Sequence, residues 1–173
     1  MTSILGTKSI QHPNGTAAAT IDESGRILTP ARPAFRARHD AGSAAGIQGV
    51  ITFNVEDFDI GGNYNTSNGR FTAPVAGIYY FCFDALVVND ASNSALASGQ
   101  STRVTFIKNG SEFAGSQRSY ARIDGATTYS TIHRVDCIQL AVNDYIQVNV
   151  TDKFIYTDTT GYYDPAFQGF LIG

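Results

Sequence analysis

The chain has 173 residues, 43% of them hydrophobic, which is the size of one domain and enough to bury a core without disulfide bonds. Its 12 basic and 15 acidic residues leave a net charge of −3, so it lacks the positive field that a nucleic-acid-binding protein needs. No run of about 18 apolar residues is present, and no membrane-inserted helix is therefore expected.

Residues 1–32 differ in composition from the rest, because they are rich in Thr, Ser, Ala and Gly. Glu23-Ser24-Gly25-Arg26 is a turn signal flanked by Ile21 and Ile27-Leu28, which predicts a small hairpin. Pro30 and Pro33 separate this segment from the remainder of the chain. Its apolar content is too low for a core of its own. We expect an N-terminal arm that is either a disordered tail or a segment that docks on a partner or a neighbouring copy.

For a complete gene product, the start of the chain also bears on where the protein is made. Met1–Lys8 lacks the basic region and the apolar run of a secretory signal. This predicts synthesis in a cytosol.

Residues 33–173 alternate between strand-like and turn-like segments, with no sustained helical period. The predicted strands are Val50–Val55, Arg70–Ala73, Ile78–Val88, Arg103–Lys108, Thr127–Leu140, Tyr145–Val150 and Ala166–Ile172. The predicted turns are Gly61-Gly62, Asn109-Gly110, Asp124-Gly125 and Asn143-Asp144. The pattern predicts an all-β domain of two packed antiparallel sheets.

The strand Ile78–Val88 carries large side chains on both faces. A strand of a two-sheet sandwich buries one face and turns the other to solvent, so a second aromatic face predicts a contact between subunits. Composition alone predicts an oligomer without giving its number. The aromatic residues assigned to the core or to contacts between subunits are Tyr79, Tyr80, Phe81, Phe83, Phe167 and Phe170.

The two cysteines, Cys82 and Cys137, lie inside predicted strands. We expect both to be buried free thiols, since small apolar side chains suit such positions. A disulfide between them is the alternative, which would need an oxidising compartment.

No catalytic pattern is recognisable in the sequence. The histidines His12, His39 and His133 accompany no Gly-x-Ser-x-Gly, no His-Glu-x-x-His and no phosphate-binding glycine loop. We therefore predict that the chain is not an enzyme. A polysaccharide-degrading enzyme on the same scaffold is a further alternative, because a fold alone excludes no activity.

Two groups of loop residues are candidates for ligand binding. Asp152, Asp158 and Asp164 offer the hard oxygen ligands that Ca²⁺ prefers, with solvated carboxylates as the alternative. Tyr156, Tyr162 and Tyr163 lie among threonines, a composition that resembles recognition loops; the alternative is that these rings cover the sandwich or a contact between subunits. The predicted recognition loops are Asn89–Gln100, Gly115–Gly125 and Thr151–Pro165.

An ordered set of short segments resembles the C1q-like domains of the C1q/tumour-necrosis-factor jelly-roll group. The segments are Pro33-Ala34-Phe35-Arg36-Ala37, Ile51-Thr52-Phe53-Asn54, Tyr64, Gly69-Arg70-Phe71-Thr72-Ala73-Pro74, Gly77-Ile78-Tyr79-Tyr80-Phe81, Lys108-Asn109-Gly110, Leu140 with Asn143-Asp144, and Phe167-Gln168-Gly169-Phe170-Leu171. The resemblance implies a jelly-roll domain over residues 33–173 that assembles as a homotrimer. Several members of the group bind Ca²⁺ near the tip of the trimer, and no collagen-like Gly-X-Y repeat is present here.

The arm carries a second resemblance. Ser9-Ile10-Gln11-His12, Thr20-Ile21-Asp22 and Ser24-Gly25-Arg26-Ile27 look like the leaders of virion proteins of tailed bacteriophages, in which a C1q-like domain often comes after the leader. This implies a fibre tip or surface decoration that is anchored to other virion proteins by its arm. The outward domain would then bind a host-cell glycan or protein. The alternative is a cellular or secreted recognition module unrelated to a virion.

Overall fold

The computed structural model describes residues 6–40, 46–92, 94–113, 119–122, 129–157 and 164–173. Every regular element in these ranges is a β-strand, and every strand pairing is antiparallel. In the same ranges, no helix is long and apolar enough to cross a membrane. The predicted all-β class is confirmed.

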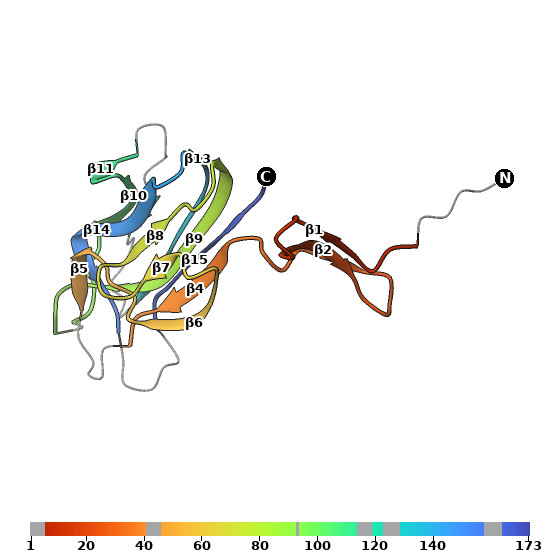
Figure 1. Cartoon of the computed structure of the whole chain (residues 1–173). Helices are drawn as coiled ribbons and strands as arrows, with labels where there is room; N and C mark the ends of the chain where they lie inside the picture. Colours follow the sequence, from red (N-terminus) through yellow and green to blue (C-terminus); the bar gives the residue numbers. More distant parts are fainter. Residues whose placement is uncertain (1–5, 41–45, 93, 114–118, 123–128, 158–163) are drawn as a thin grey trace.

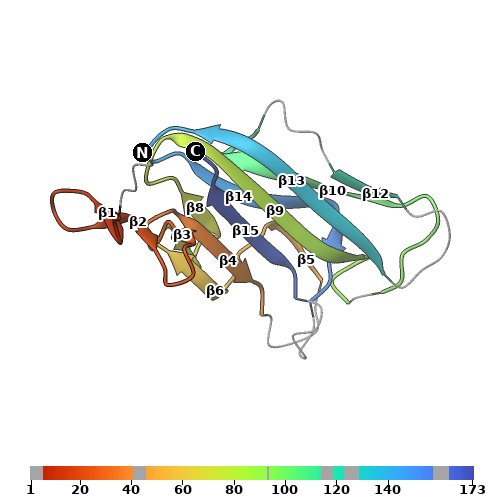
Figure 2. The same cartoon turned by 90° about the vertical axis from the view of Figure 1, so that its right-hand side faces the viewer.

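The strands of the main domain form two packed layers that meet at one corner (Figures 1 and 2). The first layer, sheet I, has the order β13-β9-β15-β4-β6, with strands β13 (Ser130–Leu140), β9 (Gly77–Val88), β15 (Ala166–Leu171), β4 (Ala34–Arg38) and β6 (Val55–Ile60). The second layer, sheet II, contains β10 (Ser101–Lys108), β14 (Tyr145–Ile155), β8 (Arg70–Thr72), β7 (Tyr64–Asn65), β5 (Ile47–Val50), β11 (Ser111–Glu112) and β12 (Ser119–Arg122).

The two layers are hydrogen-bonded to each other where β9 and β14 end. Phe154 and Ile155 of β14 pair there with Val88 and Val87 of β9. This junction fixes one corner of a jelly-roll sandwich, and the core lies between the layers.

The core is built mainly of aromatic rings. Alternate residues of β9 point inward, so Tyr79, Phe81 and Phe83 are fully buried. Phe167 of β15 lies against them, with its ring centroid 5.8 Å from that of Phe81 and 4.9 Å from that of Phe35. Such offset and edge-on contacts add to the gain from burial alone.

One predicted strand is wrong and several are shorter than the real ones. Val50–Val55 spans parts of β5 and β6, and residues 51–54 between them belong to neither. The chain crosses there from sheet II, where β5 pairs with β14, to sheet I, where β6 pairs with β4. Ile51 and Phe53 in this crossing segment are buried, so its sequence shows the alternation of apolar and polar residues that is typical of a strand.

The predicted turns lie where expected in the described ranges. Asn109 and Gly110 both have positive φ (52° and 84°), as the tight turn between β10 and β11 requires. Gly61, Gly62 and Asn143 also have positive φ. Asp124-Gly125 lies outside the described residues.

The start of the chain forms a separate three-stranded sheet, here called the N-terminal sheet, of β1 (Ser9–Gln11), β2 (Ala17–Ile21) and β3 (Ile27–Leu28). It stands away from the sandwich at the pole where the C-terminus lies (Figure 1). The predicted hairpin is confirmed, because Ile21 pairs with Ile27. Asp22 closes its turn by accepting the amides of Ser24 and Arg26 at 2.9 Å.

Candidate interface and binding site

The outward face of sheet I aligns side chains from all five strands. Paired residues of an antiparallel ladder lie on the same face, so the registers define rows that run across the sheet. One row, read from β13 to β6, is Cys137, Tyr80, Phe170, Ala34 and Ile60. The next row is Val135, Cys82, Gln168, Arg36 and Phe58.

Large apolar side chains remain uncovered along these rows. Phe170 is 44% exposed, and Ile78, which lies near the start of β9 on the same face, is 47% exposed. The rings of Tyr80 and Phe170 contact each other, with centroids 5.1 Å apart. We call this surface the apolar band, and its members are Phe58, Ile60, Ile78, Tyr80, Val135 and Phe170. An uncovered apolar surface of this kind marks an interaction site.

The structure separates the six aromatics that the sequence pattern groups together. Tyr79, Phe81, Phe83 and Phe167 are fully buried in the core of a single chain, while Tyr80 and Phe170 lie outward in the apolar band. The period of two along β9 and β15 produces this division. The core of a single chain therefore buries four of the six rings. Only Tyr80 and Phe170 remain available for a contact with another subunit.

The other end of the same face is charged. Arg38 binds Asp164 at 2.8 Å and Asp57 at 3.3 Å, and Arg36 also forms an ion pair with Asp57. His133 and Asp84 are neighbours across β13 and β9. They line, with Arg36 and Asp164, a shallow hollow of about 310 Å³. The face thus changes along the strands from apolar to charged.

The cysteines both lie on this outward face. Cys82 is half-buried and Cys137 is exposed, so the expectation of a buried thiol is wrong for Cys137 in a single chain. The inward positions of β13 belong to residues of the other parity, such as Ile132 and Ile138. Burial, followed by the nearby charge of Asp84, raises the pKa of the Cys82 thiol, which keeps it in the unreactive protonated form.

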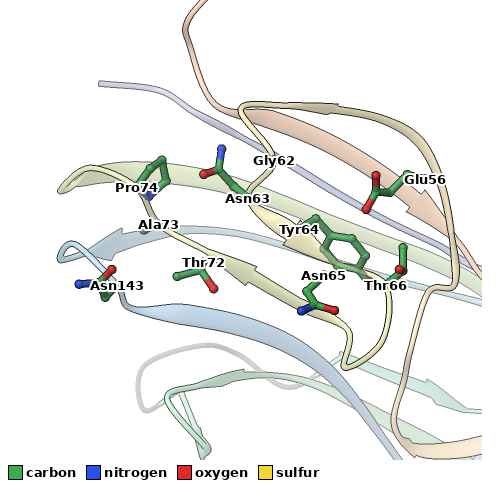
Figure 3. Close-up of a pocket in the computed structure, with 10 residues that line it drawn as sticks. All are labelled: Glu56, Gly62, Asn63, Tyr64, Asn65, Thr66, Thr72, Ala73, Pro74 and Asn143. Carbon is green, nitrogen blue, oxygen red and sulfur yellow. The ribbon is translucent and has the colours of Figure 1, made fainter.

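A second candidate is a polar hollow of about 540 Å³ beside β7 and β8 (Figure 3). Its walls carry amides, hydroxyls and one carboxylate, from Glu56, Asn63, Asn65, Thr66, Thr72 and Asn143. Tyr64 lines it too, with its hydroxyl turned to the backbone of Phe53 at 3.2 Å. Burial raises the pKa of Tyr64, so this hydroxyl stays protonated. The groups can exchange directional hydrogen bonds with a polar ligand.

The structure describes two of the three predicted calcium ligands, Asp152 and Asp164. Asp164 has a nearly buried side chain, 3% exposed, and its charge is met by Arg38. Asp152 is exposed in β14, and Asp158 lies outside the described residues. Within the described ranges, no three His, Cys, Asp or Glu side chains gather closely enough to hold a metal ion. Calcium binding stays a prediction.

The predicted recognition tyrosines are only partly placed. Tyr156 packs edge-on against Tyr129, with ring centroids 4.8 Å apart, and Tyr162 and Tyr163 lie outside the described residues. In the predicted loop Asn89–Gln100, Asp90 accepts the amides of Ser92 and Ser94. Most of the loop Gly115–Gly125 is likewise outside the described residues.

Two functional features are not apparent from the sequence pattern. The apolar band includes Phe58 and Ile60 of β6, a strand that is hard to recognise because acidic residues fill three of its other four positions. The alternation Asp57-Phe58-Asp59-Ile60 is the signal that could have found it. The polar hollow is not predictable from the sequence because its walls come from four separate segments, and no local pattern indicates that they meet.

Comparisons with known proteins agree on one family and one fold. A family model described as "C1q domain" matches residues 34–172. Caprin-2 of Danio rerio is 29% identical over 146 residues, which are 84% of this chain and 14% of that protein. A complement C1q subcomponent of Rattus norvegicus is 28% identical over 128 residues, 72% of this chain and 44% of that one. The chain spans less than half the length of either relative.

Among solved structures, the globular domain of zebrafish complement 1qA protein has a TM-score of 0.55 at 20% identity, over 82% of this chain and 98% of that one. Murine APRIL, crystallised at pH 5.0, has a TM-score of 0.54 at 12% identity, over 81% and 98%. These likenesses support the jelly-roll fold.

Proposed function

The chain belongs to the C1q domain family, and we propose that it is a homotrimeric, non-enzymatic recognition module. The apolar band carries this proposal. Its six side chains lie on one face of sheet I, and in the described part of a single chain all of them except the half-buried Tyr80 are exposed. Domains of the C1q and tumour-necrosis-factor group typically assemble as trimers. Three copies that meet through this face would remove the band from water.

For the recognised ligand, the polar hollow supports a neutral, hydroxyl-rich molecule such as a glycan. Asparagine amides and threonine hydroxyls both donate and accept hydrogen bonds, and one carboxylate, Glu56, adds a strong acceptor. Each site would bind weakly, and three sites on one trimer would raise the avidity. The second candidate ligand is a protein held by the predicted recognition loops, at the pole away from the C-terminus. Tyr156 would be among its contacts.

For the setting, we propose the surface of a bacteriophage particle, with the N-terminal sheet attached to other virion proteins. The leader-like pattern of residues 9–27 supports it. The alternative is a cellular or secreted recognition module, which the animal relatives support. If the virion setting is right, protein lacking residues 1–32 will no longer enter particles, and its incorporation would favour the alternative.

The trimer is tested by the mass of the protein in solution. Light scattering at micromolar concentration should give about three times the 18.5 kDa of one chain. Phe170→Glu places a charge in the apolar band and should give single chains with an unchanged β-sheet circular dichroism spectrum. Val50→Glu is the matched control, since Val50 is similarly exposed on sheet II and should leave the trimer intact. A wild-type protein of single-chain mass would refute the trimer.

Ligand binding is tested with a glycan array probed by the purified trimer. We expect retention of specific glycans that the double variant Asn65→Ala, Thr66→Ala loses, because it removes two hydrogen-bonding groups from the hollow. Tyr156→Ala should bind as the wild type does. If Tyr156→Ala alone abolishes binding, recognition belongs to the loops instead.

A further inference from the structure

The N-terminal sheet has an uncovered apolar face, and we propose that three copies of this sheet pack face to face in the trimer and form a second core. This inference rests on the proposed trimer. It concerns a part of the chain that lies outside the C1q match at residues 34–172.

The face is defined by the strand registers. Ile10 pairs with Ala19, and Ile21 pairs with Ile27. Ala19 and Ile21 are two positions apart on β2, so all four side chains lie on one face. Ile10 is 62% exposed, Ile21 37% and Ile27 72%.

The other face of the same sheet is more polar. Ser9 pairs with Thr20, and Thr20 pairs with Leu28, so these three side chains share it. Leu28 is its one large apolar residue. The sheet is thus amphipathic, with three isoleucines on one face and mainly hydroxyls on the other.

The sheet is too small to be stable alone with its apolar face in water. Its strands contain three, five and two residues. Isolated sheets of so few residues are marginal unless a packed apolar face supports them. The described part of a single chain supplies no such packing, because Ile10, Ile21 and Ile27 stay exposed and no described strand ladder joins the N-terminal sheet to sheets I and II.

The short link between the N-terminal sheet and the domain indicates that the apolar face of this sheet is covered by the N-terminal sheets of the other two copies. Only residues 29–33 separate β3 from β4, a reach of at most about 18 Å. Pro30 and Pro33 stiffen the link, and the carbonyl of Pro33 accepts the amide of Leu171 at 3.0 Å. Each N-terminal sheet therefore stays close to the point where its β4 begins.

That point lies in the apolar band. Ala34, the first residue of β4, is the neighbour of Phe170 on one side and of Ile60 on the other. A trimer built through the band gathers the three starting points of β4, and with them the three N-terminal sheets. Lys8 and Arg26 balance Asp22 and Glu23 over residues 6–28, so the three copies carry no net charge that would keep them apart.

Three identical faces around a threefold axis can each cover the others, because a cyclic arrangement closes on itself. The isoleucines would then meet on the axis, with the hydroxyl-bearing face turned to solvent. Burial of three Ile side chains per chain would make this second core a contributor to the trimer's stability.

The experiment is photo-crosslinking of the full chain. With p-benzoylphenylalanine at position 27, illumination should yield covalent dimers and trimers whose linked peptides both come from residues 6–28. The same group at position 28 is the matched control, since it points to the opposite face, and it should yield little crosslinked product. Crosslinks from position 27 to the chain's own domain, or none at all in a protein of trimeric mass, would overturn the inference.

A second measurement does not depend on the crosslinker. In wild-type trimer, hydrogen exchange of the β2 amides should be slow, and the double variant Ile21→Ser, Ile27→Ser should lose about tenfold or more of that protection, while Leu28→Ser retains it. Equal loss in both variants would overturn the face assignment. Light scattering on the same samples separates the two proposals: single-chain mass for wild type refutes the trimer itself, whereas trimeric mass with unprotected β2 amides refutes only the second core.

Discussion

At the scale of single residues, Gly169 of β15 lies so close to the neighbouring strand β9 that no side chain fits between them. A Cβ at this position would lie 2.6 Å from Cδ1 of Phe81 and 2.8 Å from the carbonyl oxygen of Tyr80. Phe81 is fully buried and packed against Phe167, so its ring has no free space to enter. Glycine is required here by the lack of room for a side chain.

We therefore predict that Gly169→Ala lowers the free energy of unfolding by about 1–3 kcal/mol, the usual cost of overpacking. Urea denaturation at a fixed protein concentration measures it, because an oligomer's stability depends on concentration. Gly6→Ala is the control, since nothing lies within 4 Å of that position. An unchanged midpoint for Gly169→Ala would contradict the packing described.

Asp144 joins two turns that are far apart in the sequence. Its carboxylate accepts the side-chain amide of Asn109 at 2.7 Å, lies 2.9 Å from Nζ of Lys108 and accepts the amide of Ala141 at 2.8 Å. These contacts lower the pKa of Asp144 to about 2. The charged form is thus favoured by the folded state.

The lowered pKa of Asp144 gives the sign of its pH dependence. The stabilisation is complete above the pKa of an unfolded aspartate, about 4, and is lost as the pH falls through about 2. We predict that Asp144→Asn reduces the free energy of unfolding most at pH 7, and that the difference from wild type shrinks between pH 4 and pH 2. Chemical denaturation across this range measures it, and a difference that grows on acidification would contradict the contacts.

At the scale of strands, the sequence predicts most of the features that depend on neighbouring residues, namely the strands and the tight turns. Ile78–Val88 matches β9 to within one residue, and the turn at Asn109-Gly110 has the backbone that its residues suggest. The polar hollow and the pairing of Asp144 with Asn109 are not predictable in this way, because they depend on which segments the sheets bring together. Arg134 is a further case: it is 4% exposed in β13, with its charge over the ring of Phe106 and beside Asp136.

Removal of residues 1–32 tests whether the sandwich stands alone. The truncated chain keeps Pro33, whose carbonyl accepts the amide of Leu171, and loses no core residue. We predict a β-sheet circular dichroism spectrum and a cooperative thermal transition like those of the full chain. Its trimer should dissociate at higher concentrations than the full chain does, since the second core is gone. Loss of the cooperative transition would show that the N-terminal sheet is part of the domain.

At the scale of the whole molecule, one thiol reports on assembly. Cys137 is exposed in a single chain and lies in the same row as Tyr80 and Phe170. If the apolar band is covered in the trimer, Cys137 is covered with it. The thiol that contradicted the sequence expectation therefore becomes a probe of the interface.

We predict that maleimide labels Cys137 much more slowly in the wild-type trimer than in the single chains of Phe170→Glu. Peptide mass spectrometry distinguishes Cys137 from the half-buried Cys82. Equal labelling rates in the two proteins would place the interface between subunits away from this face of sheet I.

The antiparallel pairing of β4 with β15 also sets how the molecule bears mechanical force. Ala34, at the start of β4, pairs with Phe170, near the end of β15, and Arg38 pairs with Ala166 at the other end of the ladder. A pull applied between the two termini would open this ladder one pair at a time. A pull between the N-terminal sheet and a partner held by the loops near Tyr156, at the far pole, would run along β4 instead, and would load all five pairs with β15 together with the ladder to β6. If those loops are the binding site, a module tethered at its start would meet tension in the direction in which its strands resist it best.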